Sequence, residues 1–253
     1  MNIDLSGQVA LVTGGSRGLG KAISLGLADA GADIIIASRK IENCEKVAAE
    51  VEAKGRQALA VAAHTADMAS LDALIDAAYE RFGKIDLLVN NAGTNPAMGT
   101  LSDLSPELFD KMMGINVKGP WYLASRIAPK MGAAGGGSII NMISVSGIRP
   151  AAYQGFYSCN KAALDALTKV MAAEWADMNI RVNAIAPGSY HSDLFDISAA
   201  AMPGFEDGAK EASMMKRIAA TEEILGPVLY LASDLGSFTT GSTVVADGGY
   251  LAK

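Results

Sequence analysis

Residues 9–20 read VALVTGGSRGLG, an apolar run that passes into a turn containing four glycines. The run from Val9 to Val12 predicts a buried strand, and the segment after Gly20 has the periodicity of a helix. Glycines at such a turn let phosphate oxygens approach the N–H groups at the start of the helix, where the helix dipole favours negative charge. The stretch therefore predicts a phosphate-binding βα turn, although its spacing differs from the common GxGxxG pattern.

The rest of the chain repeats this alternation of short apolar runs and longer amphipathic segments. Ile41 to Lys54 and Leu71 to Arg81 carry charges on one face and Ala, Leu and Val on the other, as expected of surface helices. Most of the apolar runs are nearly continuous, which is typical of parallel strands covered on both faces. We therefore predict an α/β fold with a Rossmann-like, doubly wound, mostly parallel seven-stranded sheet and helices on both faces. The six further candidate strands are Asp33 to Ala37, Ala58 to Ala62, Ile85 to Val89, Ser138 to Met142, Arg181 to Ala186 and Thr243 to Ala246.

Length and composition place the chain among ordinary globular proteins. Of its 253 residues 50% are apolar and 19% charged, and no repeat or linker-like tract divides them, so one domain over residues 1–253 is predicted. A formal net charge of −6 argues against nucleic acid or an anionic membrane as the main partner. The two cysteines form no CxxC pair, and the sequence reads as having no signal peptide or membrane-length apolar run. A cytoplasmic protein is therefore expected.

One segment interrupts the regular alternation. Residues 189–221 hold no candidate strand, and their short helical pieces are separated by Pro203-Gly204. The segment also carries large apolar side chains, among them Leu194, Met202 and Phe205. A segment of this length in a compact domain is usually functional, so we predict a substrate lid, with a plain surface excursion as the alternative.

The end of the second predicted strand bears on the choice of cofactor. In dinucleotide-binding folds an acidic residue near this position accepts hydrogen bonds from a ribose 2′-hydroxyl and selects NAD. Here Ser38 and Arg39 stand at the strand's end and no acid is present. Arg39, with Arg17 in the glycine-rich turn, can bind a 2′-phosphate that a carboxylate would repel. We therefore predict NADP(H) rather than NAD(H), the alternative being that Arg39 and Lys40 are ordinary solvated charges.

Tyr157 and Lys161 are the candidate acid–base pair. They stand four residues apart in Phe156 to Asp177, which reads as one long helix, so both side chains project from one face. A free tyrosine titrates near about pH 10, and a neighbouring ammonium would stabilise the phenolate and lower that pKa. Because such a pair also arises by chance, it indicates a catalytic site only together with other suitable residues.

Two polar residues support a catalytic role for Tyr157 and Lys161. Ser144 follows the fifth predicted strand, at the sheet end where ligand crevices lie, and its hydroxyl could hold a substrate oxygen. Asn116 offers an amide that could order a water beside Lys161. Taken singly, each is better explained as a capping or turn residue.

Taken together, these residues resemble the short-chain dehydrogenase/reductase family in its compact single-domain form. The resemblance covers essentially the whole chain, and motifs in this order and spacing are highly specific. They are TGGSRGLG at 13–20, NNAG at 90–93, NVKG at 116–119, Ser144, YSCNK at 157–161, NAIAPG at 183–188 and the closing DGG at 247–249.

The resemblance implies a catalytic tetrad of Asn116, Ser144, Tyr157 and Lys161. Ser144 would orient the carbonyl, Tyr157 would transfer the proton, Lys161 would bind the nicotinamide ribose and tune Tyr157, and Asn116 would hold a relay water. Hydride would pass between nicotinamide C4 and the substrate carbon.

The same resemblance implies a set of cofactor contacts. Asp67 and Met68 are expected to face the adenine, and Asn90 the middle of the cofactor. The full expected set is Gly14, Ser16, Arg17, Gly18, Leu19, Ser38, Arg39, Asp67, Met68, Asn90, Ala92, Gly93, Tyr157, Lys161, Pro187, Gly188, Tyr190 and Ser192.

The sequence departs in three places from the pattern that the resemblance leads us to expect. Ile143 precedes Ser144 where two serines are frequent, and bulky Tyr190 with Ser192 follows Pro187-Gly188. The stretch 217–222 lacks the usual glycine and proline, so the hinge of the lid is expected to differ.

The leading hypothesis is an NADP(H)-dependent carbonyl reductase or alcohol dehydrogenase acting on a small-molecule carbonyl or secondary alcohol. A 3-oxoacyl-[acyl-carrier-protein] reductase is the alternative, but an acidic carrier would favour basic residues, which the turn at 131–137 lacks. A non-catalytic dinucleotide sensor is less favoured because all four catalytic positions are kept. His64 and His191 are the only histidines and lie far apart, so no metal site is expected.

The resemblance also implies a homotetramer, or a homodimer. The contacts would come from the helices near 105–131 and 156–177 and from the C-terminal strand. The sequence does not name the substrate, which depends on the shape of the pocket. The residues expected to set that shape are Asn95, Pro96, Ile143, Tyr153, Gln154, Tyr190 and the lid.

Overall fold

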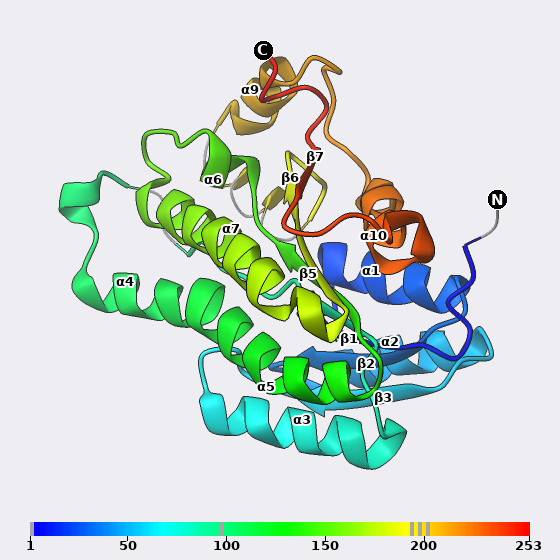
Figure 1. Ribbon diagram of the computed structural model, residues 1–253. Coiled ribbons are helices and arrows are strands. Elements are labelled where there is room, and N and C mark those ends of the chain that lie inside the picture. Colours follow the sequence, from blue (N-terminus) through cyan, green and yellow to red (C-terminus); the bar gives the residue numbers. More distant parts are fainter. Residues whose placement is uncertain (1–2, 97–98, 193–194, 197–198, 201–202) are drawn as a thin grey trace.

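The computed structural model describes residues 3–96, 99–192, 195–196, 199–200 and 203–253 (Figure 1). Seven strands of this part form one sheet in which every neighbouring pair is parallel. They are β1 Val9–Thr13, β2 Asp33–Ser38, β3 Ala58–Ala62, β4 Leu87–Asn90, β5 Gly137–Met142, β6 Ile180–Pro187 and β7 Thr243–Ala246. Their order is β3-β2-β1-β4-β5-β6-β7, which confirms the predicted Rossmann-like, doubly wound sheet.

The predicted strands are found within two residues of their expected ends. The largest difference is at β4, which begins at Leu87 rather than at Ile85. Asp86 lies just before it and is tied to β1 twice, since its carboxylate accepts from Val9 N at 2.8 Å and its N–H donates to Val9 O at 2.9 Å. This contact aligns the start of β4 with the start of β1.

Two apolar cores lie on the two faces of the sheet, because successive strand residues point to opposite sides. Ala10 and Val12 of β1 belong to one core, and Val9 and Leu11 belong to the other. The first core is covered by α1 Gly18–Asp29, α2 Ile41–Ala53 and α10 Leu225–Ala232. The second is covered by α3 Met68–Phe82, α5 Gly119–Ala133 and α7 Gly155–Trp175. Each fully buried Leu or Ile contributes about 1.5–3 kcal/mol, so these faces supply most of the driving force for folding.

The helix predicted near 105–131 is present but not uniform. It consists of α4 Pro106–Met113, a π-helical turn over Gly114–Lys118, and then α5. A Cβ at Gly119 would lie 2.1 Å from the carbonyl oxygen of Thr65, so only glycine allows this close approach to the loop after β3. Such π turns are rare in proteins, and those that occur often lie at functional sites.

The carboxyl ends of the strands carry the remaining short elements, α6 Val145–Ile148 and α9 Phe205–Ala212. Figure 1 shows α9 beside the end of the chain, and Met215 N donates to Gly248 O at 3.0 Å there. Within the predicted lid, Tyr190 and Ala219 form an isolated parallel bridge that joins its two ends. The lid residues Leu194 and Met202 lie outside the described residues, and the lid function stays a prediction.

Candidate active site

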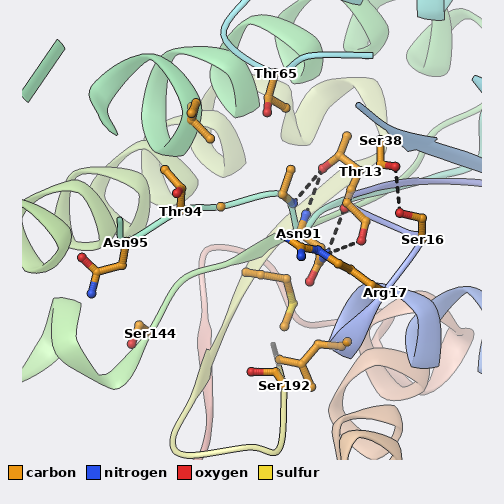
Figure 2. Close-up of a pocket in the computed structure, with 18 of the residues that line it drawn as sticks. Thr13, Ser16, Arg17, Ser38, Thr65, Asn91, Thr94, Asn95, Ser144 and Ser192 are labelled. Atoms are coloured by element: carbon orange, nitrogen blue, oxygen red, sulfur yellow. Dashed lines mark hydrogen bonds between the residues drawn. The ribbon is translucent and has the colours of Figure 1, made fainter. Parts of the chain in front are cut away.

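A cavity of about 720 Å³ opens at the carboxyl edge of β1, β2, β4, β5 and β6, where open α/β sheets bind ligands. In Figure 2, Ser16 and Ser38 lie toward one end of this cavity, and Asn95 and Ser144 lie toward the other. Most of the predicted site residues form its wall. They are Gly14, Ser16, Arg17, Gly18, Leu19, Ser38, Arg39, Ala92, Gly93, Ser144, Tyr157, Lys161, Pro187, Gly188, Tyr190 and Ser192.

The glycine-rich turn brings backbone close to this wall. Gly14 has φ +64°, and a Cβ there would lie 3.0 Å from both Ala92 Cα and Asn91 Nδ2. A Cβ at Gly20 would lie 2.1 Å from Gly14 O, so the first turn of α1 sits directly on the loop. In the described structure α1 has no side-chain cap at Arg17 and no acid in its first turn. Its first N–H groups and its dipole therefore suit an anionic ligand such as a pyrophosphate.

The end of β2 forms the neighbouring part of the wall. Ser16 Oγ and Ser38 Oγ are 2.7 Å apart, a contact visible in Figure 2 that fixes the turn against the strand. Ser38 Oγ also lies 3.1 Å from Cys44 Sγ. Arg39 and Lys40 are exposed and line the cavity, with no carboxylate among its lining residues. This end of the cavity is therefore basic at Arg39, the residue on which the prediction of NADP(H) depends.

Asn90 does not reach the cavity and is a structural residue in the described chain. Its side chain is 1% exposed, and its amide donates to Asn141 Oδ1 at 2.9 Å and to Pro120 O at 3.2 Å. The next residue, Asn91, lines the cavity instead and donates to Thr13 O at 2.9 Å (Figure 2). The expectation for Asn90 therefore shifts by one residue, since successive strand residues face opposite sides.

Asp67 and Met68, expected to face the adenine, lie outside the cavity wall. The Asp67 carboxylate caps α3 by accepting from the N–H groups of Ala69 and Ser70, at 3.1 and 3.3 Å. Met68 packs against the second apolar core. His64 and Thr65 line the cavity in their place. They follow the end of β3 directly, which is the signal in the sequence that could have identified them.

Tyr157 and Lys161 lie together at the first turns of α7, as their spacing predicts. Lys161 is 4% exposed, and its Nζ donates to Met142 O at 2.7 Å. The same nitrogen lies 5.7 Å from the centroid of the Tyr157 ring. Burial lowers the pKa of Lys161 to about 8.

The phenol of Tyr157 does not follow the expectation of a lowered pKa. Burial raises the pKa of Tyr157, and its interaction with Ser144 opposes that rise because the hydroxyl stabilises the phenolate. Tyr157 is therefore protonated at neutral pH in the chain by itself. A protonated phenol in a cavity is suited to donating a proton to a ligand oxygen.

Ser144 occupies the junction between β5 and α6. It caps α6 by accepting from Ser146 N at 3.2 Å, so the capping explanation holds alongside any catalytic one. Ser146 Oγ in turn donates to Gln154 Oε1 at 2.6 Å. Ile143 and Gln154 line the cavity as expected, whereas Tyr153 is 60% exposed and does not.

Asn116 lies behind the cavity wall, in the π-helical turn, and is fully buried. Its Oδ1 accepts from Thr94 N at 2.8 Å, and its Nδ2 donates to Thr94 O at 2.9 Å and to Asn160 Oδ1 at 3.1 Å. A Cβ at Gly93 would lie 3.4 Å from both Asn116 Oδ1 and Lys161 Nζ. Both amide N–H groups are thus used, and Oδ1, which already accepts from Thr94 N, has one further lone pair that could accept a hydrogen bond.

A second cavity of about 530 Å³ adjoins the first at Ser144, Gln154, Tyr190 and Phe205, which line both. It lies between α6, α9 and the chain after β7. In the described residues no group of three or more His, Cys, Asp and Glu side chains could hold a metal. Over the same part of the chain, no helix is long and apolar enough to cross a bilayer.

Comparison with known proteins identifies the family. A family model described as enoyl-(acyl carrier protein) reductase matches residues 14–251. The mouse dehydrogenase/reductase SDR family member 4 is 37% identical over 249 residues, covering 97% of this chain and 88% of its own.

Two solved structures are similar over nearly their whole length. L-sorbose reductase from Gluconobacter frateurii, complexed with NADPH and L-sorbose, has 33% identity and a TM-score of 0.95, covering 100% of both chains. A 3-ketoacyl-(acyl-carrier-protein) reductase from Brucella melitensis, complexed with NADH, has 31% identity and a TM-score of 0.90, covering 98% of this chain and 99% of that one. With its parallel sheet and glycine-rich turn, the chain belongs to the short-chain dehydrogenase/reductase family of oxidoreductases.

Proposed function

We propose that the chain transfers hydride between NADP(H) and the carbonyl or secondary alcohol of a small molecule, with Tyr157 as general acid and base. The observation that carries this proposal is one cavity lined at one end by the glycine-rich turn and Arg39, and at the other by Ser144, Tyr157 and Lys161. A nicotinamide dinucleotide bound along this cavity would have its phosphates at the first end. Its nicotinamide would then lie at the second end, beside Tyr157.

The residues present fit a nicotinamide dinucleotide. The N–H groups at the start of α1 would hold the pyrophosphate. Glycine at position 14 lets the turn that precedes them pack against Asn91 and Ala92. Lys161 would bind the nicotinamide ribose, and Pro187, Gly188 and Ser192 would flank the ring, since all four line the cavity. When bound, the cofactor supplies or accepts the hydride at the substrate carbon.

The protein's own contribution is to position the substrate oxygen and move a proton. In the direction of reduction, the phenolic proton of Tyr157 passes to the carbonyl oxygen as the carbon gains hydride, and Ser144 donates a hydrogen bond to the same oxygen. The Lys161 ammonium stabilises the phenolate left behind. Asn116 would hold a water that returns the proton to the site, a role supported by its position in the turn behind Gly93 and Lys161. In the direction of oxidation the same groups act in reverse.

NADP(H) is preferred because the end of β2 is basic. Arg39 and Lys40 line the cavity beside Ser38, and a 2′-phosphate there would meet a guanidinium rather than a carboxylate. The Gluconobacter reductase is a relative with NADPH bound, whereas the Brucella relative carries NADH, so the preference rests on this chain's own residues.

The carrier-protein alternative is less favoured than a free small molecule. The stretch 131–137, where α5 ends and β5 begins, holds only methionine, alanine and glycine, so it offers no basic side chain to an acidic carrier. We further infer one domain over residues 1–253, and a homotetramer or homodimer. Exposed apolar residues on α4, α5, α7 and β7 support the oligomer. They are Phe109, Trp121, Val170 and Val245.

The experiment that tests the function follows consumption of NADPH and of NADH with a panel of ketones, diketones, 3-oxoesters, quinones and sugars. Turnover with NADPH is expected for at least one class. Tight cofactor binding without turnover of any class would favour the non-catalytic sensor, and a preference for NADH would contradict the role given to Arg39.

A further inference from the structure

The second cavity has walls of mixed chemistry. One wall is the face of α9 formed by Gly208, Ala209 and Ala212, whose small side chains leave the space open. Val145, Phe205 and Met215 are further apolar residues of its lining. The charged side chains that line this cavity already have partners. Arg217 binds Glu223 through two contacts of 2.6 Å, and the Asp247 carboxylate accepts from the N–H groups of Gly249 and Leu251.

The junction between the two cavities lies at the reacting group. Ser144 and Gln154 line both spaces, and so does Tyr190, which is 6% exposed and packs in the first apolar core. The amide oxygen of Gln154 is committed to Ser146 Oγ at 2.6 Å, so Gln154 presents its N–H groups as donors. A substrate whose carbonyl oxygen contacts Ser144 could therefore extend from the first cavity into the second.

The substrate shares the first cavity with the proposed cofactor. Its lining runs from Arg39 to Tyr157, which is the track proposed for the dinucleotide. A bound dinucleotide would lie along this track. The remaining open space next to Ser144 is the second cavity, and its volume of about 530 Å³ falls in the range that holds a drug-sized ligand.

We propose that the second cavity receives the apolar chain of the substrate, and that the preferred substrates are carbonyl compounds with an extended alkyl or aryl group rather than short polyhydroxylated ketones. This inference rests on the proposed function. Gly208 and Ala212 set the specificity, because they leave room for the chain under α9. Gln154 donates to a polar group of the substrate close to the carbonyl.

Gly208 makes the inference testable without disturbing the fold. A Cβ at Gly208 would meet no atom within 4 Å, and its φ is not in the left-handed region. Gly208→Leu therefore adds volume beside the cavity, and replacement of glycine within a helix favours the helical state. Ala212→Leu is the second variant, one turn further along the same wall. Asp207→Leu is the matched control, because Asp207 is exposed on the same helix and lines neither cavity.

The measurement is kcat/KM for NADPH-dependent reduction of a series of 2-alkanones from butanone to decanone, with a ketose as the polar comparison. In the parent, kcat/KM is expected to rise roughly fourfold for each methylene that enters the cavity. Gly208→Leu and Ala212→Leu should flatten the series by tenfold or more at its long end. The loss should be smallest for butanone, whose chain is the shortest of the series, and NADPH binding, followed by fluorescence, should report that the cofactor site is intact.

Each outcome separates this inference from the function on which it rests. Reduction of all alkanones at one rate, unaltered by either leucine variant, would overturn the chain-binding cavity and leave the oxidoreductase assignment intact. Preference for the ketose over every alkanone would do the same. An equal loss in Asp207→Leu would assign the effect to α9 as a helix and not to the cavity. If no carbonyl compound were reduced, the proposed function itself would fail.

Discussion

Lys161 Nζ lies 5.7 Å from the centroid of the Tyr157 ring, at the inner end of the cavity. Its hydrogen bond to Met142 O fixes the ammonium in this place, and α7 fixes the ring, so the pair is set by secondary structure on both sides. Burial acts on the two groups in ways that matter for chemistry. It raises the pKa of Tyr157 and lowers that of Lys161 to about 8, so both groups carry their protons at neutral pH.

The first prediction concerns pH. Lys161 is protonated below about pH 8 and neutral above it, and only the charged form stabilises the phenolate left when Tyr157 gives up its proton. For NADPH-dependent reduction, kcat/KM should therefore fall as pH rises through about 8, while Tyr157 itself stays protonated. The measurement is kcat/KM of the parent over a pH series. A profile without an alkaline fall would remove this role of Lys161.

The second prediction concerns cofactor choice. Arg39→Ala removes the guanidinium proposed to bind the 2′-phosphate, and a hydrogen bond to a charged group contributes about 1.5–3 kcal/mol. The Kd of NADPH should rise by roughly 10- to 100-fold, and that of NADH should stay within about twofold. Isothermal titration with both cofactors measures this.

Arg126→Ala is the matched control for that experiment. Arg126 is an exposed arginine on α5 that lies 3.7 Å from Asp72, away from the cavity wall. It should change neither constant. Equal weakening of NADPH and NADH by Arg39→Ala would show that Arg39 is a general contact with no part in selecting the phosphate.

A third prediction concerns the glycine-rich turn. Gly20→Ala places a methyl group 2.1 Å from Gly14 O, so the turn and α1 must move apart. The expected loss of stability is about 1–3 kcal/mol, or a fall in Tm of several degrees, in thermal unfolding without cofactor. Gly226→Ala in α10 is the control, since a Cβ there meets nothing within 4 Å and should stabilise by up to about 1 kcal/mol. Similar Tm values for the two variants would contradict the close packing of the turn.

A fourth prediction concerns assembly. Val170 is 48% exposed on α7 and Val245 is 44% exposed on the edge strand β7, and an unpaired apolar edge of this kind usually has a partner. Light scattering at micromolar concentration should give a tetramer or a dimer. Val170→Asp should shift the mass towards smaller species. A parent protein that is monomeric under these conditions would refute the inferred oligomer.

The sheet could be predicted from the sequence because its signals are local. Seven near-continuous apolar runs separated by helical periodicity fix the strands, and the run of glycines after Val12 fixes the first turn. The placement of Tyr157 and Lys161 on one face follows from helical geometry alone. The positions of Ser144 and Arg39 follow from the rule that strand ends gather at one edge.

The remaining features depend on packing that no local signal reports. At the end of β4, Asn90 is buried and the next residue, Asn91, lines the cavity. Both are asparagines, so residue type alone could not tell them apart. Asp67 serves as a helix cap, which competes with any role towards a ligand. The π-helical turn that buries Asn116 is set by contacts with Thr94 and Asn160, which come from other elements.

Tyr157 is the group proposed to move the proton, and replacing it in Tyr157→Phe tests that role. The variant keeps the ring and removes only the hydroxyl. Tyr79→Phe is the control, because the Tyr79 hydroxyl is buried on α3 without a partner in the described structure and lies outside both cavities. With the best substrate and NADPH, kcat should fall by roughly 10²- to 10⁴-fold in Tyr157→Phe, with NADPH affinity and the Tyr79→Phe variant unchanged. Turnover by Tyr157→Phe within about twofold of the parent would contradict the account, since the proton would then come from another group.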